Sequence, residues 1–314
     1  RQFQSESDAS KESEKSPSNA GTSFDADEFL AGLDAMFASH TAKDKADEYL
    51  QQAMADAENA QDYAGLLTVL NETMGFYRSQ GRHQENQWII QRAIELALRM
   101  GLEGTEAWTT TLINAATSQR AAGNLDQAED LFEQALDAAR RTYGPDDRRL
   151  AALHNNRSML FSQTHRRRQA IDELHESLRI LEHSSVDAQS DVDIASTCTN
   201  LALAMLDGED QPTDAELEEA QSLARRTLDI YQHAGSDSSA HYASALAGAA
   251  HVSFASEDYA EAVRQYQRAL DVIARCYGEH TDYYRVTAQN LQEAQRKLEL
   301  TQSTDNPHDS VDDS

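Results

Sequence analysis

Small and large apolar residues recur along most of the chain with the spacing of an amphipathic helix. In one segment, Ala128 is followed by Phe132 four residues later and by Ala135 seven residues later, with mainly polar residues between them. Residues that are four and seven positions apart lie on one face of an α-helix. The segment is therefore predicted to be a helix with one buried face.

The same pattern returns at a nearly fixed interval. The steps between its first small residues are 42, 42, 50 and 42 residues, at Asn86, Ala128, Ala170, Ala220 and Ala262. The second small residue of each copy is Ala93, Ala135, Ser177, Thr227 or Ala269. The longer step coincides with the sequence GEDQPTD at 208–214, whose residues favour a turn. A period of this length is typical of a protein that grows by stacking repeats.

The pattern predicts five helical hairpins and a shorter, less regular pair before them. First helices are expected near 62–80, 106–122, 148–164, 191–207 and 240–256, and second helices near 83–100, 125–143, 167–183, 215–234 and 259–277. The irregular pair is expected at 25–40 and 44–60, within a degenerate hairpin over 25–60. Residues 283–300 are expected to cap the stack, because their end, EAQRKLEL, is polar enough to face water on one side.

These features resemble the tetratricopeptide repeat (TPR), whose second helix carries a small, a large and a small residue at this spacing. Its usual period is about 34 residues. The 42-residue period and the linkers YGPDD and YGEHT resemble the kinesin-light-chain subgroup, which has longer helices. The resemblance covers roughly residues 62–300 and implies an all-α fold, an α-α superhelix in the form of a right-handed solenoid of hairpins.

The resemblance is incomplete, and two of the departures bear on packing and function. Arg157 stands where Leu or Ala is expected in the packed seam, which is the set of residues by which a first helix packs against its neighbours. The heptad region of kinesin light chains is missing, so attachment to a motor is not implied. We expect one solenoid over residues 24–300, with five repeats over about 62–282.

Composition agrees with an all-helical protein and restricts its partners. Aromatic residues make up 7% of the chain, there are only 4 Pro residues, and the formal net charge is −27. So acidic a chain is expected to repel nucleic acids, and its charge does not favour an anionic membrane surface. No stretch approaches the roughly 18 apolar residues that a membrane-spanning helix needs.

The ends of the chain and its cysteines complete this view. Residues 1–23 and 301–314 are rich in polar and charged residues, so we expect them to be disordered. Cys198 and Cys276 are isolated, without a CxxC spacing, which favours a reducing compartment such as the cytoplasm. The chain begins at Arg1, so a removed signal or anchor stays possible, and the oligomeric state is open.

Asparagine recurs on the first helices at one place, which we call the ladder position. It lies just before the packed seam and holds Glu72, Asn114, Asn156, Asn200, Gly248 and Asn290. Asn is unfavourable inside a helix, and its amide offers both a donor and an acceptor. The resemblance implies that these amides, with the adjacent Asn155, hold the main chain of a peptide in a concave groove. The alternative is that they bond a neighbouring helix.

Three other residues on the first helices are candidate peptide contacts. The positions expected to face the groove are the ladder position and the residues one and four positions before it. They contain no Lys or Arg, which disfavours a site that binds the C-terminal carboxylates of a partner protein. Arg78 and Arg120 lie further along their helices and either contact an acidic group or are solvated or paired with neighbouring Glu residues. His251 has no second ligand at metal-binding spacing, so it is considered only as a peptide contact.

A basic band over 140–149 and 165–169 also has two interpretations. It is either a set of turns balanced by nearby carboxylates or a docking edge for an acidic partner.

No catalytic motif is visible in the sequence. There is no HExxH, nucleophile elbow or Gly-rich phosphate loop, so we expect neither an enzyme nor a bound cofactor or metal. The leading hypothesis is a non-catalytic scaffold for protein–protein interaction that binds a peptide or partner protein in its concave groove. The alternative is the peptide-sensing regulatory domain of a larger regulator, whose N-terminal part is missing from this chain.

Overall fold

The computed structural model describes residues 23–39, 42–208 and 210–305. These residues form thirteen helices and no strand, so the all-α prediction is confirmed. Most of the two segments that were expected to be disordered, residues 1–22 and 306–314, lies outside the described residues.

The chain divides into two compact units, Arg1–Pro145 and Asp146–Ser314. The first unit contains α1 (Ala26–Ala38), α2 (Ala42–Asn59), α3 (Tyr63–Ser79), α4 (His83–Arg99), α5 (Glu106–Ala121) and α6 (Leu125–Tyr143). The second contains α7 (Arg148–Gln163), α8 (Arg167–Ser184), α9 (Val192–Leu206), α10 (Asp214–His233), α11 (Ala240–Ala255), α12 (Tyr259–Tyr277) and α13 (Asp282–Thr304). A single solenoid over 24–300 stays a prediction.

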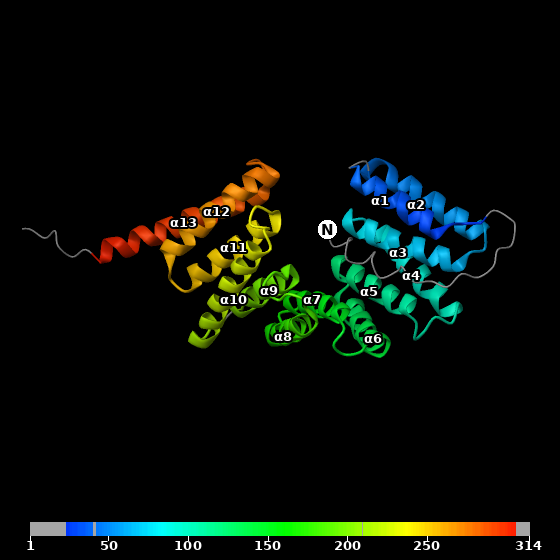
Figure 1. Ribbon diagram of the computed structural model, residues 1–314, viewed down its shortest axis with the longest axis horizontal. Coiled ribbons are helices and arrows are strands. Elements are labelled where there is room, and N and C mark those ends of the chain that lie inside the picture. The colour runs from blue at the N-terminus through cyan, green and yellow to red at the C-terminus, as the bar shows by residue number, and fades with distance from the viewer. Residues whose placement is uncertain (1–22, 40–41, 209, 306–314) are drawn as a thin grey trace, which may run out of the picture. The chain divides into compact units, whose positions relative to one another are not determined.

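The predicted helices agree with the observed ones to within two residues, except that α13 continues to Thr304. Consecutive helices pair as hairpins within each unit, for example α5 with α6 and α9 with α10 (Figure 1). Neighbouring first helices also touch, as α3 touches α5 and α9 touches α11. First helices therefore form one layer of each unit and second helices the other.

Every first helix from α3 onward begins with a side-chain cap. The caps are Asp62, Thr105, Asp147, Asp191, Ser239 and Thr281, and the side chain of each accepts a hydrogen bond from a backbone N–H of the first turn. Such caps satisfy donors that the helix itself leaves unpaired. The local sequence thus fixes where each hairpin starts.

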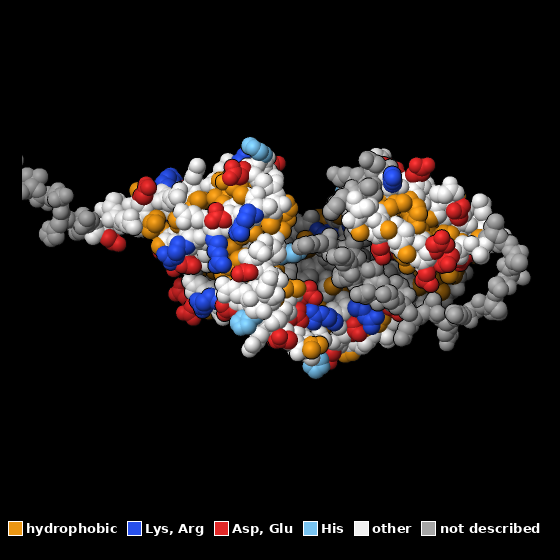
Figure 2. All heavy atoms as spheres, turned by 45° about the horizontal axis from the view of Figure 1, so that its top comes forward, with side chains coloured by type: hydrophobic (Ala, Val, Ile, Leu, Met, Phe, Trp, Pro, Cys, Tyr) orange, Lys and Arg blue, Asp and Glu red, His pale blue; other side chains and the backbone are white. Residues whose placement is uncertain are grey.

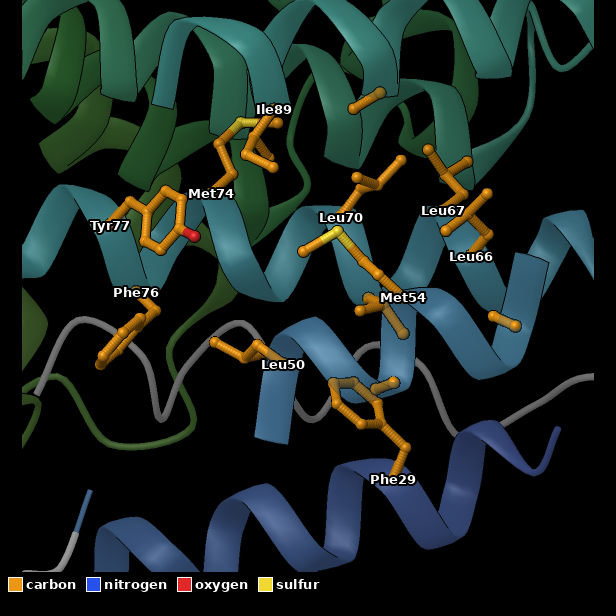
Figure 3. Packing of buried hydrophobic residues seen from close by; sticks show 14 of the residues in the cluster. Phe29, Leu50, Met54, Leu66, Leu67, Leu70, Met74, Phe76, Tyr77 and Ile89 are labelled. Atoms are coloured by element: carbon orange, nitrogen blue, oxygen red, sulfur yellow. The ribbon is translucent and has the colours of Figure 1, made fainter. Parts of the chain in front are cut away.

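The irregular first pair of helices belongs to the hydrophobic core of the first unit. Figure 3 shows Phe29 of α1 and Leu50 and Met54 of α2 directed toward α3, where Leu66 and Leu70 lie. All five side chains are buried. The hairpin over 25–60 therefore covers one side of α3, whose other side packs on α4.

The small residues of the repeat lie in the tight contacts that the pattern predicted. Ala128, Ala170, Ala220 and Ala262 have no exposed surface. In two copies the second small residue carries a hydroxyl: Ser177 donates to the carbonyl oxygen of Ala151, and Thr227 donates to that of Ala195. These bonds allow a polar atom at a fully buried place.

Charged side chains are distributed over the surface. Figure 2 shows Asp and Glu across the visible face, with Lys or Arg beside them in many places. None of the helices described has the length and apolar character needed to cross a lipid bilayer.

Candidate peptide-binding surface

The asparagines of the ladder position differ in burial. Asn114 of α5 is only 7% exposed, and its Nδ2 donates to Oδ1 of Asn71 on α3 over 3.1 Å. Its backbone carbonyl accepts from the guanidinium of Arg78 at 3.4 Å. The amide nitrogen of Asn114 is thus engaged inside the first unit, which supports the structural interpretation for this residue.

Asn155 is also engaged by its neighbours. Its Nδ2 lies 3.3 Å from the carbonyl oxygen of Ala151, 2.7 Å from Oγ of Ser177 and 3.0 Å from Oγ1 of Thr197. These partners lie on α7, α8 and α9, so one side chain joins three helices. Its Oδ1 is buried and has no hydrogen-bond partner among the described residues.

The bridge from Asn155 to Thr197 has a counterpart in the first unit. There Nδ2 of Asn71 donates to Oγ1 of Thr111 over 3.1 Å. Asn71 and Asn155 each come directly before the ladder position of their own helix. Each bonds to a threonine, Thr111 or Thr197, that lies three residues before the ladder position of the next first helix. Sequence reasoning missed these bridges; the available signal was an Asn followed 40 or 42 residues later by a Thr.

Three ladder asparagines of the second unit remain accessible. Asn156 of α7 is half-buried, whereas Asn200 of α9 and Asn290 of α13 are exposed. None of the three makes a side-chain hydrogen bond to another described residue. Exposed Ser196 and half-buried Thr199 lie near Asn200 on α9, and the hydroxyl of Thr199 already donates to the carbonyl oxygen of Ala195.

The ladder is interrupted on α11 by Gly248, which is buried. A Cβ at this position would lie 3.0 Å from Cγ2 of Thr199 on α9. Close approach of the two first helices therefore explains why the amide is missing there.

The two candidate arginines lie in the first unit, on α3 and α5. Arg78 donates to Oγ of Ser118 over 2.9 Å, which ties it to the neighbouring first helix. Burial and the positive charge of Arg78 lower the pKa of the Arg120 guanidinium. The two cations are therefore close enough to interact, and both are half-buried.

His251 is exposed on α11, where a ligand could reach it. Within the described residues, no group of three or more His, Cys, Asp or Glu side chains could hold a metal ion.

Arg157, the unusual seam residue, belongs to a polar cluster between α7 and α8. Its NH1 lies 2.9 Å from Oε1 of Glu173, and Nδ1 of the buried His154 lies 2.6 Å from Oε2 of the same carboxylate. The guanidinium also lies 5.0 Å from the ring centroid of Phe161. An ion pair and a cation–π contact thus replace the expected apolar contact.

Several arginines of the basic band are engaged within the second unit. Arg167 donates to the carbonyl oxygens of Ala204 and Met205 at the end of α9 and pairs with Glu216 of α10. Arg148 pairs with Asp191 at 2.7 Å and with Asp193 at 2.8 Å. These contacts support the interpretation of the band as structural.

Comparison with known proteins agrees with this architecture. Residues 107–183 match the family described as tetratricopeptide repeat. No curated protein matches the chain.

Two solved structures share the fold. BtubC (BKLC) from P. vanneervenii is similar with a TM-score of 0.60 and 18% sequence identity, over 82% of this chain and 94% of that one. The "putative kinesin light chain nearly identical TPR-like repeats" of Podosopora anserina have a TM-score of 0.56 and 15% identity, over 67% of this chain and 96% of that one. The repeat spacing, the stacked hairpins and these comparisons lead to one conclusion: residues 107–183 match the tetratricopeptide repeat, and the fold of the chain is similar to that of the kinesin-light-chain-like repeats.

Proposed function

We propose that the protein is a non-catalytic interaction scaffold that binds an extended segment of a partner protein on the first helices of its second unit. The observation that carries this proposal is the contrast within the ladder position. The side-chain amide of Asn114 is hydrogen-bonded to Asn71. The side-chain amides of Asn156 and Asn200, on successive first helices, make no hydrogen bond to another described residue.

The chemistry of this surface supports a main-chain ligand. A carboxamide can donate to a peptide carbonyl and accept from a peptide N–H, so it pairs with any sequence in extended form. The exposed Ser196, one helical turn before Asn200 on α9, adds an uncharged hydroxyl to this surface. Affinity would therefore come from main-chain hydrogen bonds, and specificity from side chains that flank them.

The test begins with peptides selected on the wild-type protein from a random-sequence library. The double variant Asn156→Ala/Asn200→Ala should bind a selected peptide about 5- to 150-fold more weakly, because each lost hydrogen bond contributes ~0.5–1.5 kcal/mol. Its stability should not fall, because Ala favours a helix more than Asn does. Isothermal titration and urea unfolding measure the two effects.

The matched control is Asn114→Ala, which changes the same residue type at the same position of another repeat. It should lower the free energy of unfolding by roughly 1 kcal/mol, because Oδ1 of Asn71 loses its donor, and leave peptide affinity unchanged. A double variant that keeps full affinity for every selected peptide would refute the proposal.

A further inference from the structure

A shallow pocket opens between the second helices α2 and α4 of the first unit, on a different set of helices from the asparagine surface. Its volume is about 420 Å³, and its floor is formed by Met54, Tyr77 and Ile89, which are all buried. Trp88 of α4 lines the same pocket and is 58% exposed. An exposed indole beside a pocket with an apolar floor is typical of an anchor point in a protein interface.

Two arginines lie over the aromatic rings of this pocket. The guanidinium of Arg92 lies 5.1 Å from the ring of Trp88, and that of Arg82 lies 4.1 Å from the ring of Tyr77. Arg92 pairs with Glu58 at 2.7 Å, and Arg82 pairs with Glu85 at 2.5 Å.

In both ion pairs the carboxylate is the more accessible partner. The side chains of Glu58 and Glu85 are each 56% exposed, against 25% for Arg92 and 26% for Arg82. An approaching protein therefore meets a pocket with an apolar floor and a polar rim, on which Glu58 and Glu85, each paired with an arginine, are the more exposed charges. The net charge of −27 adds attraction for cationic partners at longer range.

We propose that this pocket is a docking site for a basic amphipathic segment of a partner protein. An apolar side chain of the segment enters the pocket against Trp88, and flanking Lys or Arg side chains meet Glu58 and Glu85. The site is independent of the asparagine surface, so a scaffold of this kind holds two segments at once.

The first test uses a short helical peptide of leucine and lysine as the probe. A second peptide, with every lysine replaced by glutamate, is its control. In a Trp108→Phe background Trp88 is the sole tryptophan, because the chain has only 2. Binding of the lysine peptide should shift the emission of Trp88 to shorter wavelength. An unchanged emission, or an equal shift with the glutamate peptide, would overturn the proposal.

The second test measures affinity by anisotropy of the labelled lysine peptide. Trp88→Ala should weaken binding about tenfold or more, as expected for loss of an aromatic anchor. Leu98→Ala is the matched control, because Leu98 lies on the same helix and is 45% exposed; it should bind like wild type. Helix content measured by circular dichroism should be the same in both variants. Equal affinity of the Trp88→Ala variant and the control would overturn the proposal.

A third comparison separates the local carboxylates from the overall charge. Glu58→Gln/Glu85→Gln should lose about tenfold in affinity, because two charge-assisted contacts are removed. Glu103→Gln/Glu133→Gln changes the net charge equally at exposed residues outside the pocket and should lose much less. Equal losses would show that attraction is spread over the chain and would refute the site. The Asn156→Ala/Asn200→Ala variant should keep full affinity, which separates this site from the proposed peptide surface.

Discussion

Single buried positions show how tightly the helices of a hairpin approach one another. Ala128 and Ala135 of α6 have no exposed surface, and neither does Phe132 between them. Protein interiors are packed to near crystalline density, so a larger side chain at such a place has no free volume to enter.

Replacing Ala128 by Leu should therefore overpack the contact between α5 and α6. We expect the free energy of unfolding to fall by ~1–3 kcal/mol, measured by urea denaturation. Ala215→Leu on α10 is the control, because Ala215 is exposed and the same atoms are added there without a clash. Equal stability of the two variants would show that the seam is assigned wrongly.

Asp191 combines a helix cap with a half-buried ion pair. Burial alone would raise the pKa of its carboxyl group, but hydrogen bonds from Arg148 and Ser185 outweigh this effect and hold the pKa below its ordinary value of 3.8. A carboxylate with a lowered pKa stabilises the folded state above its ordinary pKa, and this contribution is lost as the pH falls below it.

Asp191→Asn should therefore cost stability at neutral pH, roughly 1 kcal/mol, and much less in strong acid. Asn is also a good cap, so the change removes the charge and keeps the helix start. Unfolding by urea at a series of pH values, for wild type and variant, measures the difference. A difference that stays constant from neutral pH to below pH 3 would contradict this account.

At the scale of elements, the turn inside most hairpins contains one residue in the left-handed region. It is Gly81 after α3, Gly123 after α5, His165 after α7 and Glu257 after α11, with φ between 58° and 82°. The same backbone geometry thus recurs at the repeat interval. Only Gly adopts it without a steric cost from Cβ, so His165 and Glu257 are strained.

Exchanging residues at this turn should move stability in opposite directions. His165→Gly should raise the free energy of unfolding by about 0.5–1 kcal/mol, because the Cβ penalty exceeds the entropy that Gly adds to the unfolded chain. Gly81→His should lower it, because φ at Gly81 is 68° and a residue with a Cβ is strained in that conformation. Thermal unfolding of both variants measures the changes, and a loss of stability in His165→Gly would contradict the expectation.

At the scale of the whole molecule, the net charge of −27 works against the folded state. Like charges are closer together when the chain is folded, and dissolved salt screens their repulsion. We therefore expect the melting temperature at neutral pH to rise when sodium chloride is added. The rise should shrink at acidic pH, where carboxylates lose their charge. A melting temperature that falls with salt would show that favourable ion pairs dominate.

The sequence by itself determined the helices and their pairing. Helical periodicity, capping residues such as Asp62 and Thr105, and turn residues such as Gly123 act within a few residues, so their effects can be read locally. The repeat interval then gives the order of hairpins, because each copy buries the same face. The helices agree with the structure for this reason, including the irregular pair formed by α1 and α2.

Only the tertiary structure decided which side chains are accessible. Asn114 and Asn200 occupy the same position of the repeat, yet one is buried against Asn71 and the other is exposed, because the neighbouring first helices differ. The pocket beside Trp88 likewise combines residues of α2, α3 and α4. Burial depends on what a neighbouring helix places opposite a residue, and the period of one helix carries no information about its neighbour.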